Sequence, residues 1–307
     1  MAGSSWEWKP RGVGDWLDGV FQLYRAHFKP LFGLSLAVLL PLGLLEGLAQ
    51  RAVTRNAFVA MAQALQGEDP TELLTSMAAG SPGSSAGLIF LSVLATTFLY
   101  VAGVYMVNEL LHGRSRSIGE VLNATPGYWA RYLGMSLLLF LGYLLLTGVA
   151  LGMSMGLSFA LDARWIAVVG VIVWLPVVAF LAVRWLFASQ SLVAERVGVT
   201  AAIRRSFRLT RGSFWSIVGR LLLYGLITYA LRAALDLGVF MAAGAVALTR
   251  STVAAVAFQG VVSLVGALLA PLTWIALTLI YYDLRIRKEG YDLQQVADSL
   301  EQQATPE

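Results

Sequence analysis

The chain has 307 residues, of which 58% are hydrophobic and 13% charged, with a mean hydropathy of +0.70. About a quarter of the residues of an average soluble domain are charged, so this composition excludes a water-soluble domain and predicts an integral membrane protein. The absence of cysteine excludes disulfides and thiolate chemistry, and the mild net charge of +4 indicates membrane topology rather than a nucleic-acid partner.

The chain opens with an amphipathic segment and then an apolar run. Residues 14–28 are expected to form a helix in the membrane interface, because Trp16, Val20 and their helical neighbours make one side apolar. Pro30 marks a break, and residues 31–50 form the first predicted span. The polar connection after it is expected to hold a short helix over 71–79 and a flexible lead-in over 80–87.

Five more apolar runs are long enough to cross about 30 Å of hydrocarbon. They cover residues 88–111, 133–161, 165–188, 217–237 and 253–282. Only residues 162–164 separate the third span from the fourth, which predicts a tight hairpin. A weaker interfacial segment over 114–131 is expected to be cut short by Pro126. A turn near Arg250 and Ser251 precedes the sixth span.

Residues 199–219 read as a basic amphipathic helix that leads into the fifth span. On a helical wheel, one side carries Val199, Ile203, Phe207, Leu209 and Phe214, and the other carries Arg204, Arg205, Arg208 and Arg211. We expect these arginines, with Arg25 of the first interfacial helix, to contact anionic lipid headgroups, at about 1 kcal/mol per basic residue. The alternative is that they only fix the orientation of the chain.

Lysine and arginine are distributed unequally between the two ends of the spans. Seventeen of the 22 basic residues fall on the side of both termini, four fall on the other side, and Arg232 lies within a span. The excess of positive charge marks the cytoplasmic side of a membrane protein. Both termini are therefore expected in the cytoplasm.

The pattern of an interfacial helix followed by a hairpin of two spans occurs more than once. Placing Gly33 on Gly219 aligns Phe21, Leu23, Arg25 and Phe28 with Phe207, Leu209, Arg211 and Phe214. We predict a single all-α bundle over 1–282, with a probable three-fold internal repeat of units at about 11–111, 114–188 and 196–282. Convergent patterning of interfacial helices is the alternative. Residues 283–307 form a charged tail, with a helix that carries Leu293, Val296 and Leu300 on one side.

Charges inside spans are costly and are usually paired or functional. The aligned units place Glu46 and Gln50 at the depth of Arg232 and Asp236. These four residues are expected to form a polar cluster in the outer half of the bundle. It is either a clamp, in which Glu46 pairs with Arg232, or the lining of a cavity. Arg232 and Asp236 are also four residues apart on one helix, so they can pair with each other.

Gly148, Gly152 and Gly156 recur at four-residue intervals in the third span. Small residues at this spacing let a second helix backbone approach closely. We expect packing within the chain, and a seam between two copies is the alternative.

The sequence gives little support for catalysis. His27 and His112 lie far apart without metal-ligand spacing, and neither a nucleophile elbow nor a phosphate-binding or dinucleotide-binding loop occurs. We therefore predict a protein that is not an enzyme and has neither a metal nor a cofactor.

Three stretches resemble the bacterial family known as the membrane domain of glycerophosphoryl diester phosphodiesterase, with its multi-pass relatives. They are Gly14-Asp15-x-Leu17-Asp18 running into Phe21-x-Leu23-Tyr24-Arg25-x-x-Phe28, Ala202-x-Arg204-x-Ser206-Phe207-x-Leu209-x-x-Gly212-x-Phe214-Trp215, and Tyr281-Tyr282-Asp283-Leu284-Arg285-x-Arg287-Lys288-Glu289-Gly290. The family takes its name from members fused to a soluble phosphodiesterase barrel. No such barrel fits this chain, so the resemblance implies a membrane domain without hydrolytic activity.

These observations favour a scaffold or accessory protein of the bacterial cytoplasmic membrane. Its expected partners are membrane lipids, anionic ones above all, another membrane protein or a second copy of itself. The alternative is a transporter or lipid-translocating protein that uses the outer polar cluster.

Overall fold

The computed structural model of the chain describes residues 7–65, 82–248 and 252–304. All regular secondary structure in these ranges is helical, and six of the helices are long and apolar enough to cross a membrane. The predicted class, an all-α membrane protein with six spans, is therefore confirmed.

The described residues form a succession of helices. In chain order they are α1 (Val13–Ala26), α2 (Phe28–Leu65), α4 (Pro82–Leu111), α5 (Ile118–Ala160), α6 (Trp165–Trp185), α7 (Ala188–Ala194), α8 (Val199–Thr210), α9 (Phe214–Leu248), α10 (Thr252–Glu289) and α11 (Tyr291–Ala304).

Two predicted breaks at proline are wrong. The first interfacial helix ends at Ala26 with His27 as its C-cap, and Pro30 lies in the first turn of α2, where a missing backbone N–H costs no hydrogen bond. Pro126 lies inside the continuous 43-residue helix α5, so the middle interfacial segment and the third span form one helix. One lost hydrogen bond does not end a helix whose neighbouring turns are intact and packed.

Other boundaries differ by shorter stretches. Helix α4 begins at Pro82, so most of the expected flexible lead-in is helical. Helix α10 continues to Glu289, so residues 283–289 belong to the bundle rather than to the tail. The predicted helix over 71–79 and the turn at Arg250 and Ser251 lie outside the described residues. The three-fold repeat stays a prediction.

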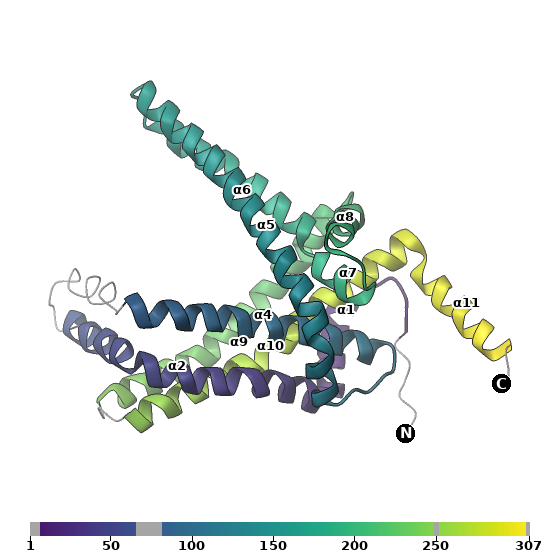
Figure 1. Ribbon diagram of the computed structural model, residues 1–307, viewed down its shortest axis with the longest axis horizontal. Coiled ribbons are helices and arrows are strands. Elements are labelled where there is room, and N and C mark those ends of the chain that lie inside the picture. Colours follow the sequence, from purple (N-terminus) through teal and green to yellow (C-terminus); the bar gives the residue numbers. More distant parts are fainter. Residues whose placement is uncertain (1–6, 66–81, 249–251, 305–307) are drawn as a thin grey trace.

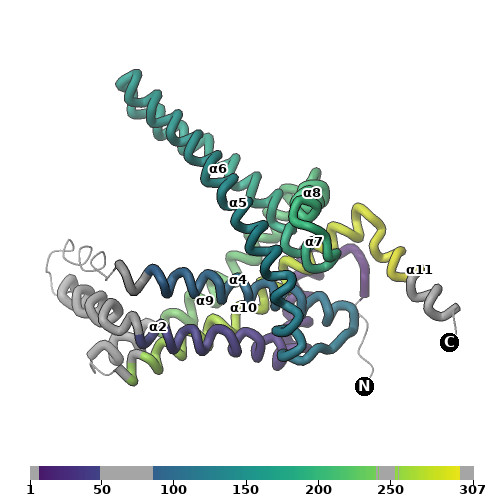
Figure 2. The backbone as a smooth tube through the Cα atoms, in the orientation of Figure 1, coloured from purple at the N-terminus to yellow at the C-terminus, as the bar shows by residue number. Residues whose placement is uncertain are grey.

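Four of the spans run side by side, and two diverge from them. Figure 1 shows α2, α4, α9 and α10 as one group, with the α5–α6 hairpin leaning away from it. The short helices α1, α7 and α8 gather at one end of the group, and α11 extends beyond that end; the tube in Figure 2 follows the tight turn between α5 and α6. Only 6% of the most apolar stretch of each hairpin helix is buried, against 50% for α10. The hairpin is thus nearly all surface, whereas α10 is the central helix.

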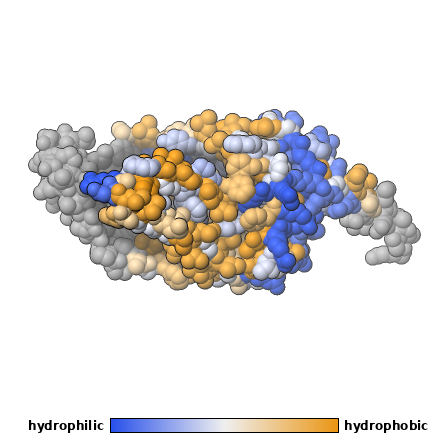
Figure 3. All heavy atoms as spheres, turned by 90° about the horizontal axis from the view of Figure 1, so that it is seen from above, coloured by the Kyte–Doolittle hydropathy of each residue, from blue (hydrophilic) through white to orange (hydrophobic). Residues whose placement is uncertain are grey.

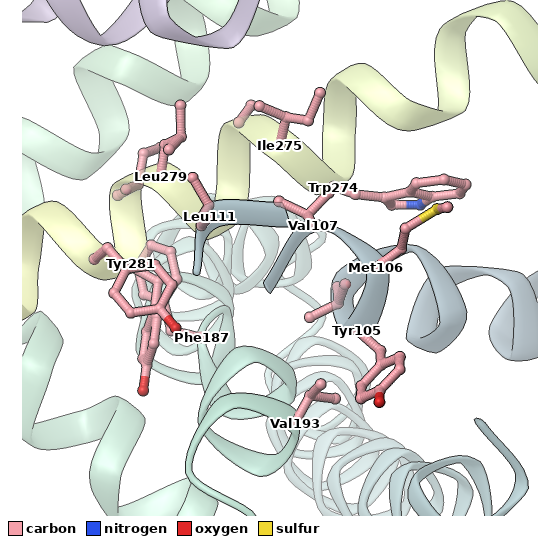
Figure 4. Close-up of a cluster of buried hydrophobic side chains, with 14 of the residues drawn as sticks. Tyr105, Met106, Val107, Leu111, Phe187, Val193, Trp274, Ile275, Leu279 and Tyr281 are labelled. Carbon is pink, nitrogen blue, oxygen red and sulfur yellow. The ribbon is translucent and has the colours of Figure 1, made fainter. Parts of the chain in front are cut away.

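The hydrophobic core lies where α4, α7 and α10 meet. Figure 4 shows Met106 and Leu111 of α4, Phe187 before α7, and Trp274 and Tyr281 of α10 converging in this region. Each of these side chains is at most 3% exposed. The core therefore sits toward the end at which the short helices gather.

Helix α4 packs tightly against Trp274 of α10 at Gly103. A Cβ atom at this position would overlap the indole ring of Trp274, which is itself buried. We predict that Gly103→Ala destabilises the protein by about 1–3 kcal/mol, because a rigid buried ring cannot move aside. The free energy of unfolding in mixed micelles is the measurement. Gly156→Ala is the matched control, because a Cβ there meets open space; equal effects of the two variants would contradict the prediction.

Candidate functional site

Polar and charged side chains gather at one end of the molecule, which we call the charged end. It is formed by α1, α7, α8 and the last turns of α10. Figure 3 shows a hydrophilic band there and hydrophobic side chains over much of the remaining surface in view. This is the pattern expected where a membrane-spanning bundle leaves the hydrocarbon.

The end of α10 connects the other elements of the charged end. Tyr281 donates a hydrogen bond to Glu195, which follows α7. Tyr282 donates to Oδ1 of Asn108 on α4 at 2.5 Å. Nζ of Lys288 donates to the carbonyl oxygens of Leu209 and Arg211, where α8 ends and leaves carbonyls without helical partners. One helical segment thus fastens α4, α7 and α8.

A buried ion pair ties the N-terminal segment to this site. Asp283 and Arg220 are 2.7 Å apart with side chains 3% and 5% exposed. Asp283 also accepts from the backbone N–H of Arg11 at 2.8 Å and from Arg287 at 2.9 Å. The carbonyl of Arg11 accepts from Arg220 and Arg287 in turn. A buried charge pair is stable only when such added hydrogen bonds are present.

Aromatic rings complete the attachment of the N-terminal segment. Trp8 packs against His112, Tyr282 and Tyr291 with ring centroids 4.8 to 5.4 Å apart. Burial is the main cause that lowers the pKa of His112. Its Nδ1 lies 2.7 Å from the carbonyl of Asn108, which can only accept, and Nε2 lies 3.0 Å from the hydroxyl of Tyr291. His112 is therefore a neutral packing residue, protonated on Nδ1.

Arg205 of α8 is held by two carboxylates. Its guanidinium donates to Glu195 at 2.8 Å and to both oxygens of Glu289 at 2.5 and 2.6 Å. Burial opposes the charge of Arg205, but these hydrogen bonds outweigh it and raise its pKa. Arg205 is thus engaged inside the protein, which differs from its expected place on the headgroup face.

The other predicted headgroup contacts point outward. Arg25, Arg204, Arg208 and Arg211 are all exposed. The side chain of Arg208 is 71% exposed, and one of its guanidinium nitrogens lies 3.9 Å from the carboxylate of Glu289. Four of the five arginines are therefore placed where lipid headgroups could reach them.

The buried side of α8 coincides only in part with the apolar side of the helical wheel: Leu209 is buried, and Val199 and Ile203 pack against the core while partly exposed. Its buried residues are Ala202, Ser206, Leu209 and Thr210, whereas Phe207 is 36% exposed. The hydroxyl of Ser206 donates to the carbonyl of Arg184 and accepts from the N–H of Phe187. Ser206 thus satisfies backbone groups at the break between α6 and α7. Ala202 and Ser206 are small, which lets the backbone of α8 approach the break between α6 and α7. The positions of the large apolar residues did not indicate this requirement.

The predicted outer polar cluster is divided into two separate groups. Glu46 of α2 accepts from Ser92 of α4 and from Gln259 of α10, so its partners come from neighbouring helices. Arg232 and Asp236 pair with each other at 3.0 Å on α9, with side chains 55% and 46% exposed. The side chain of Gln50 lies outside the described part of the structure. The expected pair of Glu46 with Arg232 is wrong, because α4 and α10 supply the neighbours of Glu46.

The three glycines of α5 do not pack within the described part of the chain. A Cβ at Gly148, Gly152 or Gly156 would have no neighbour within 4 Å. The contact inside the hairpin instead places Gly170 of α6 against the side chain of Ser154. The expected packing of these glycines within the chain is therefore not seen among the described residues, and a seam between two copies stays a prediction.

Ser92, Asn108 and Gln259 were not among the residues predicted from the sequence. All three are polar side chains in apolar spans, and that is the signal by which they could have been found. His27 is the C-cap residue of α1, and His112 directly follows the end of α4. Among the described residues no three His, Asp or Glu side chains are grouped so that they could hold a metal ion.

Fold and site together define a multi-pass helical membrane protein with a fastened, arginine-rich end. Residues 158–298 match the family described as the membrane domain of glycerophosphoryl diester phosphodiesterase. The matched segment includes α8 and the end of α10, and it confirms the resemblance over that part of the chain. No curated protein and no solved structure matches the chain in the same comparisons.

Proposed function

We propose that this protein is a non-enzymatic scaffold or accessory protein of the bacterial cytoplasmic membrane that engages anionic lipid headgroups. The observation that carries the proposal is the exposed group of Arg204 and Arg208 on α8 and Arg211 at its C-cap, while the other side of the helix is buried in the charged end. Cations at the edge of the hydrocarbon attract anionic headgroups. The carboxylates at hand are engaged by Arg205, Arg220 and other bases of the network, so this exposed group remains available.

The transporter alternative has less support. It needed Glu46, Arg232 and Asp236 to share one polar way-station. Glu46 is instead bonded to its neighbours within the bundle, and Arg232 and Asp236 pair on the surface of α9. A fastened charged end fits a platform for lipids or another membrane protein better than a moving carrier.

Lipid enrichment around the reconstituted protein tests the proposal. In bilayers of phosphatidylcholine with a minority of phosphatidylglycerol, the protein is expected to retain phosphatidylglycerol in excess. Replacing Arg25, Arg204, Arg208 and Arg211 together by Gln should remove most of the excess, since each contributes about 1 kcal/mol. Replacing Arg164 and Arg232, which lie elsewhere, should leave it unchanged. Retention by the fourfold variant equal to that of the original protein would refute the proposal.

The proposed orientation places the charged end in the cytoplasm. The native chain has no cysteine, so single cysteines report their side without further changes. In intact cells an impermeant thiol reagent is expected to label Ala163→Cys, in the turn between α5 and α6, and not Thr200→Cys on α8. Opening the cells should make both reactive. The reverse pattern would invert the orientation.

A further inference from the structure

A pocket of about 390 Å³ lies beside the outer side of α8. It is lined by Glu195, Val197, Ala201, Arg204, Arg205 and Arg208. This volume falls in the range of small-molecule sites, and the wall combines apolar carbon with charged groups. The pocket therefore has room for a group the size of a lipid headgroup.

Two of its three guanidinium groups are available to an anion. Arg205 is neutralised by Glu195 and Glu289. Arg204 makes a 3.4 Å hydrogen bond to the carbonyl of Thr200 one turn back, and Arg208 approaches Glu289 only to 3.9 Å. Arg204 and Arg208 are four residues apart on one helix, where like charges destabilise each other. An anion bound between them would turn this repulsion into attraction.

The carboxylate of Glu195 gives the pocket a second kind of polar group. The hydrogen bonds that Glu195 accepts from Arg205 and Tyr281 both fall on Oε1. Among the described residues, none of the hydrogen bonds or ion pairs of Glu195 involves Oε2. An ionised carboxylate oxygen only accepts, so Oε2 suits a hydroxyl or ammonium donor. The pocket thus pairs an anion site with an acceptor.

We propose that this pocket binds a phospholipid headgroup whose phosphodiester lies on Arg204 and Arg208 and whose hydroxyl or ammonium group donates to Glu195. The proposal rests on the proposed function and narrows it from general attraction to one site. It selects headgroups by their donor as well as by their charge. Phosphatidylglycerol, with hydroxyls, should bind best, phosphatidylethanolamine next, and phosphatidylcholine, whose quaternary ammonium has no N–H, least.

Binding of short-chain lipids to the full-length protein in detergent tests the site. Dihexanoyl forms of the three lipids are titrated, together with glycerophosphoglycerol, which has the same headgroup chemistry but no acyl chains. Arg204→Gln with Arg208→Gln should weaken phosphatidylglycerol binding by about tenfold or more, because a charge-assisted contact is lost at each position. The control, Lys29→Gln with Arg131→Gln, removes two other exposed charges and should change phosphatidylglycerol binding by less than about threefold.

A third variant blocks the pocket without changing its charge. Ala201→Leu adds volume to the lining on an exposed helix side, and it should reduce phosphatidylglycerol binding about as much as the arginine pair. An unchanged unfolding midpoint of each variant shows that the loss is not misfolding.

The possible outcomes separate the two proposals. Equal binding of all three lipids by the original protein, with no effect of any arginine variant, would overturn the proposed function and the pocket together. The pocket alone would be overturned by three results together. Both double variants, Arg204→Gln with Arg208→Gln and Lys29→Gln with Arg131→Gln, would weaken phosphatidylglycerol binding equally. Ala201→Leu would have no effect on binding, and phosphatidylethanolamine would bind no better than phosphatidylcholine. Glycerophosphoglycerol binding as tightly as the lipid would replace the lipid with a soluble phosphodiester.

Discussion

Replacing Asp283 by alanine is expected to destabilise the protein by about 3–5 kcal/mol, because the charge of Arg220 would remain buried without its partner. Asp283 is 3% exposed and also accepts hydrogen bonds from Arg287 and from the backbone N–H of Arg11. Its loss would therefore release the N-terminal segment as well as unpair α9 from α10. The free energy of unfolding in mixed micelles is the measurement.

Two further variants identify the cause of this loss. Asp18→Ala removes an exposed carboxylate of α1 and should have little effect. Replacing both members of the buried pair, Arg220→Met with Asp283→Leu, should lower the free energy of unfolding less than Asp283→Ala alone, because no unpaired charge remains. If the double variant were the less stable one, the hydrogen bonds of the pair would outweigh the burial cost of its charges.

Trp16→Ala is expected to lower the free energy of unfolding by about 3–5 kcal/mol, as for the truncation of other large buried aromatic residues. Trp16 is completely buried, and its indole N–H donates to the carbonyl of Ala276 on α10 at 3.2 Å. Tyr24, two turns further along α1, donates to the carbonyl of Leu268. Trp16 is thus the main anchor of α1 on the central helix, and its loss would leave a cavity there.

Unfolding in mixed micelles again gives the measurement. Trp215→Ala is the matched control, because that indole is 81% exposed, and it should change stability by less than about 0.5 kcal/mol. The loss of stability for Trp16→Phe should lie between the losses for Trp16→Ala and Trp215→Ala, because phenylalanine keeps most of the buried area but loses the hydrogen bond. A loss for Trp215→Ala as large as that for Trp16→Ala would contradict the assignment of Trp16 as the anchor.

The pattern of hydropathy within single segments was sufficient to find the first and last interfacial helices and the six spans. Helix α1 buries Trp16, Val20 and Leu23, which are on the side that its apolar spacing indicated. The hairpin turn between α5 and α6 falls at residues 161–164, as its polar residues predicted. Both features depend on hydropathy within one segment, which the sequence displays directly.

The local pattern failed where contact between helices decided the outcome. The wheel of α8 gave an apolar and a basic side, but it did not indicate that Ala202 and Ser206 would be buried or that Ser206 would donate to the carbonyl of Arg184 at the break between α6 and α7. The repeat alignment placed Glu46 opposite Arg232, but α4 and α10 supplied Ser92 and Gln259. Neither choice is visible in a single segment, because it depends on which helices are neighbours and how each is rotated.

The sequence alone determined that this protein is a six-span helical bundle with an arginine-rich end, since span length and charge distribution are properties of consecutive residues. Tertiary structure decided which arginines are used internally and which remain exposed. Arg205 and Arg220 are held by carboxylates from distant parts of the chain, whereas Arg208 approaches Glu289 only to 3.9 Å and Arg204 donates to the backbone carbonyl of Thr200. The physical reason is that ion pairing and pocket formation depend on distances between segments, and folding alone sets those distances.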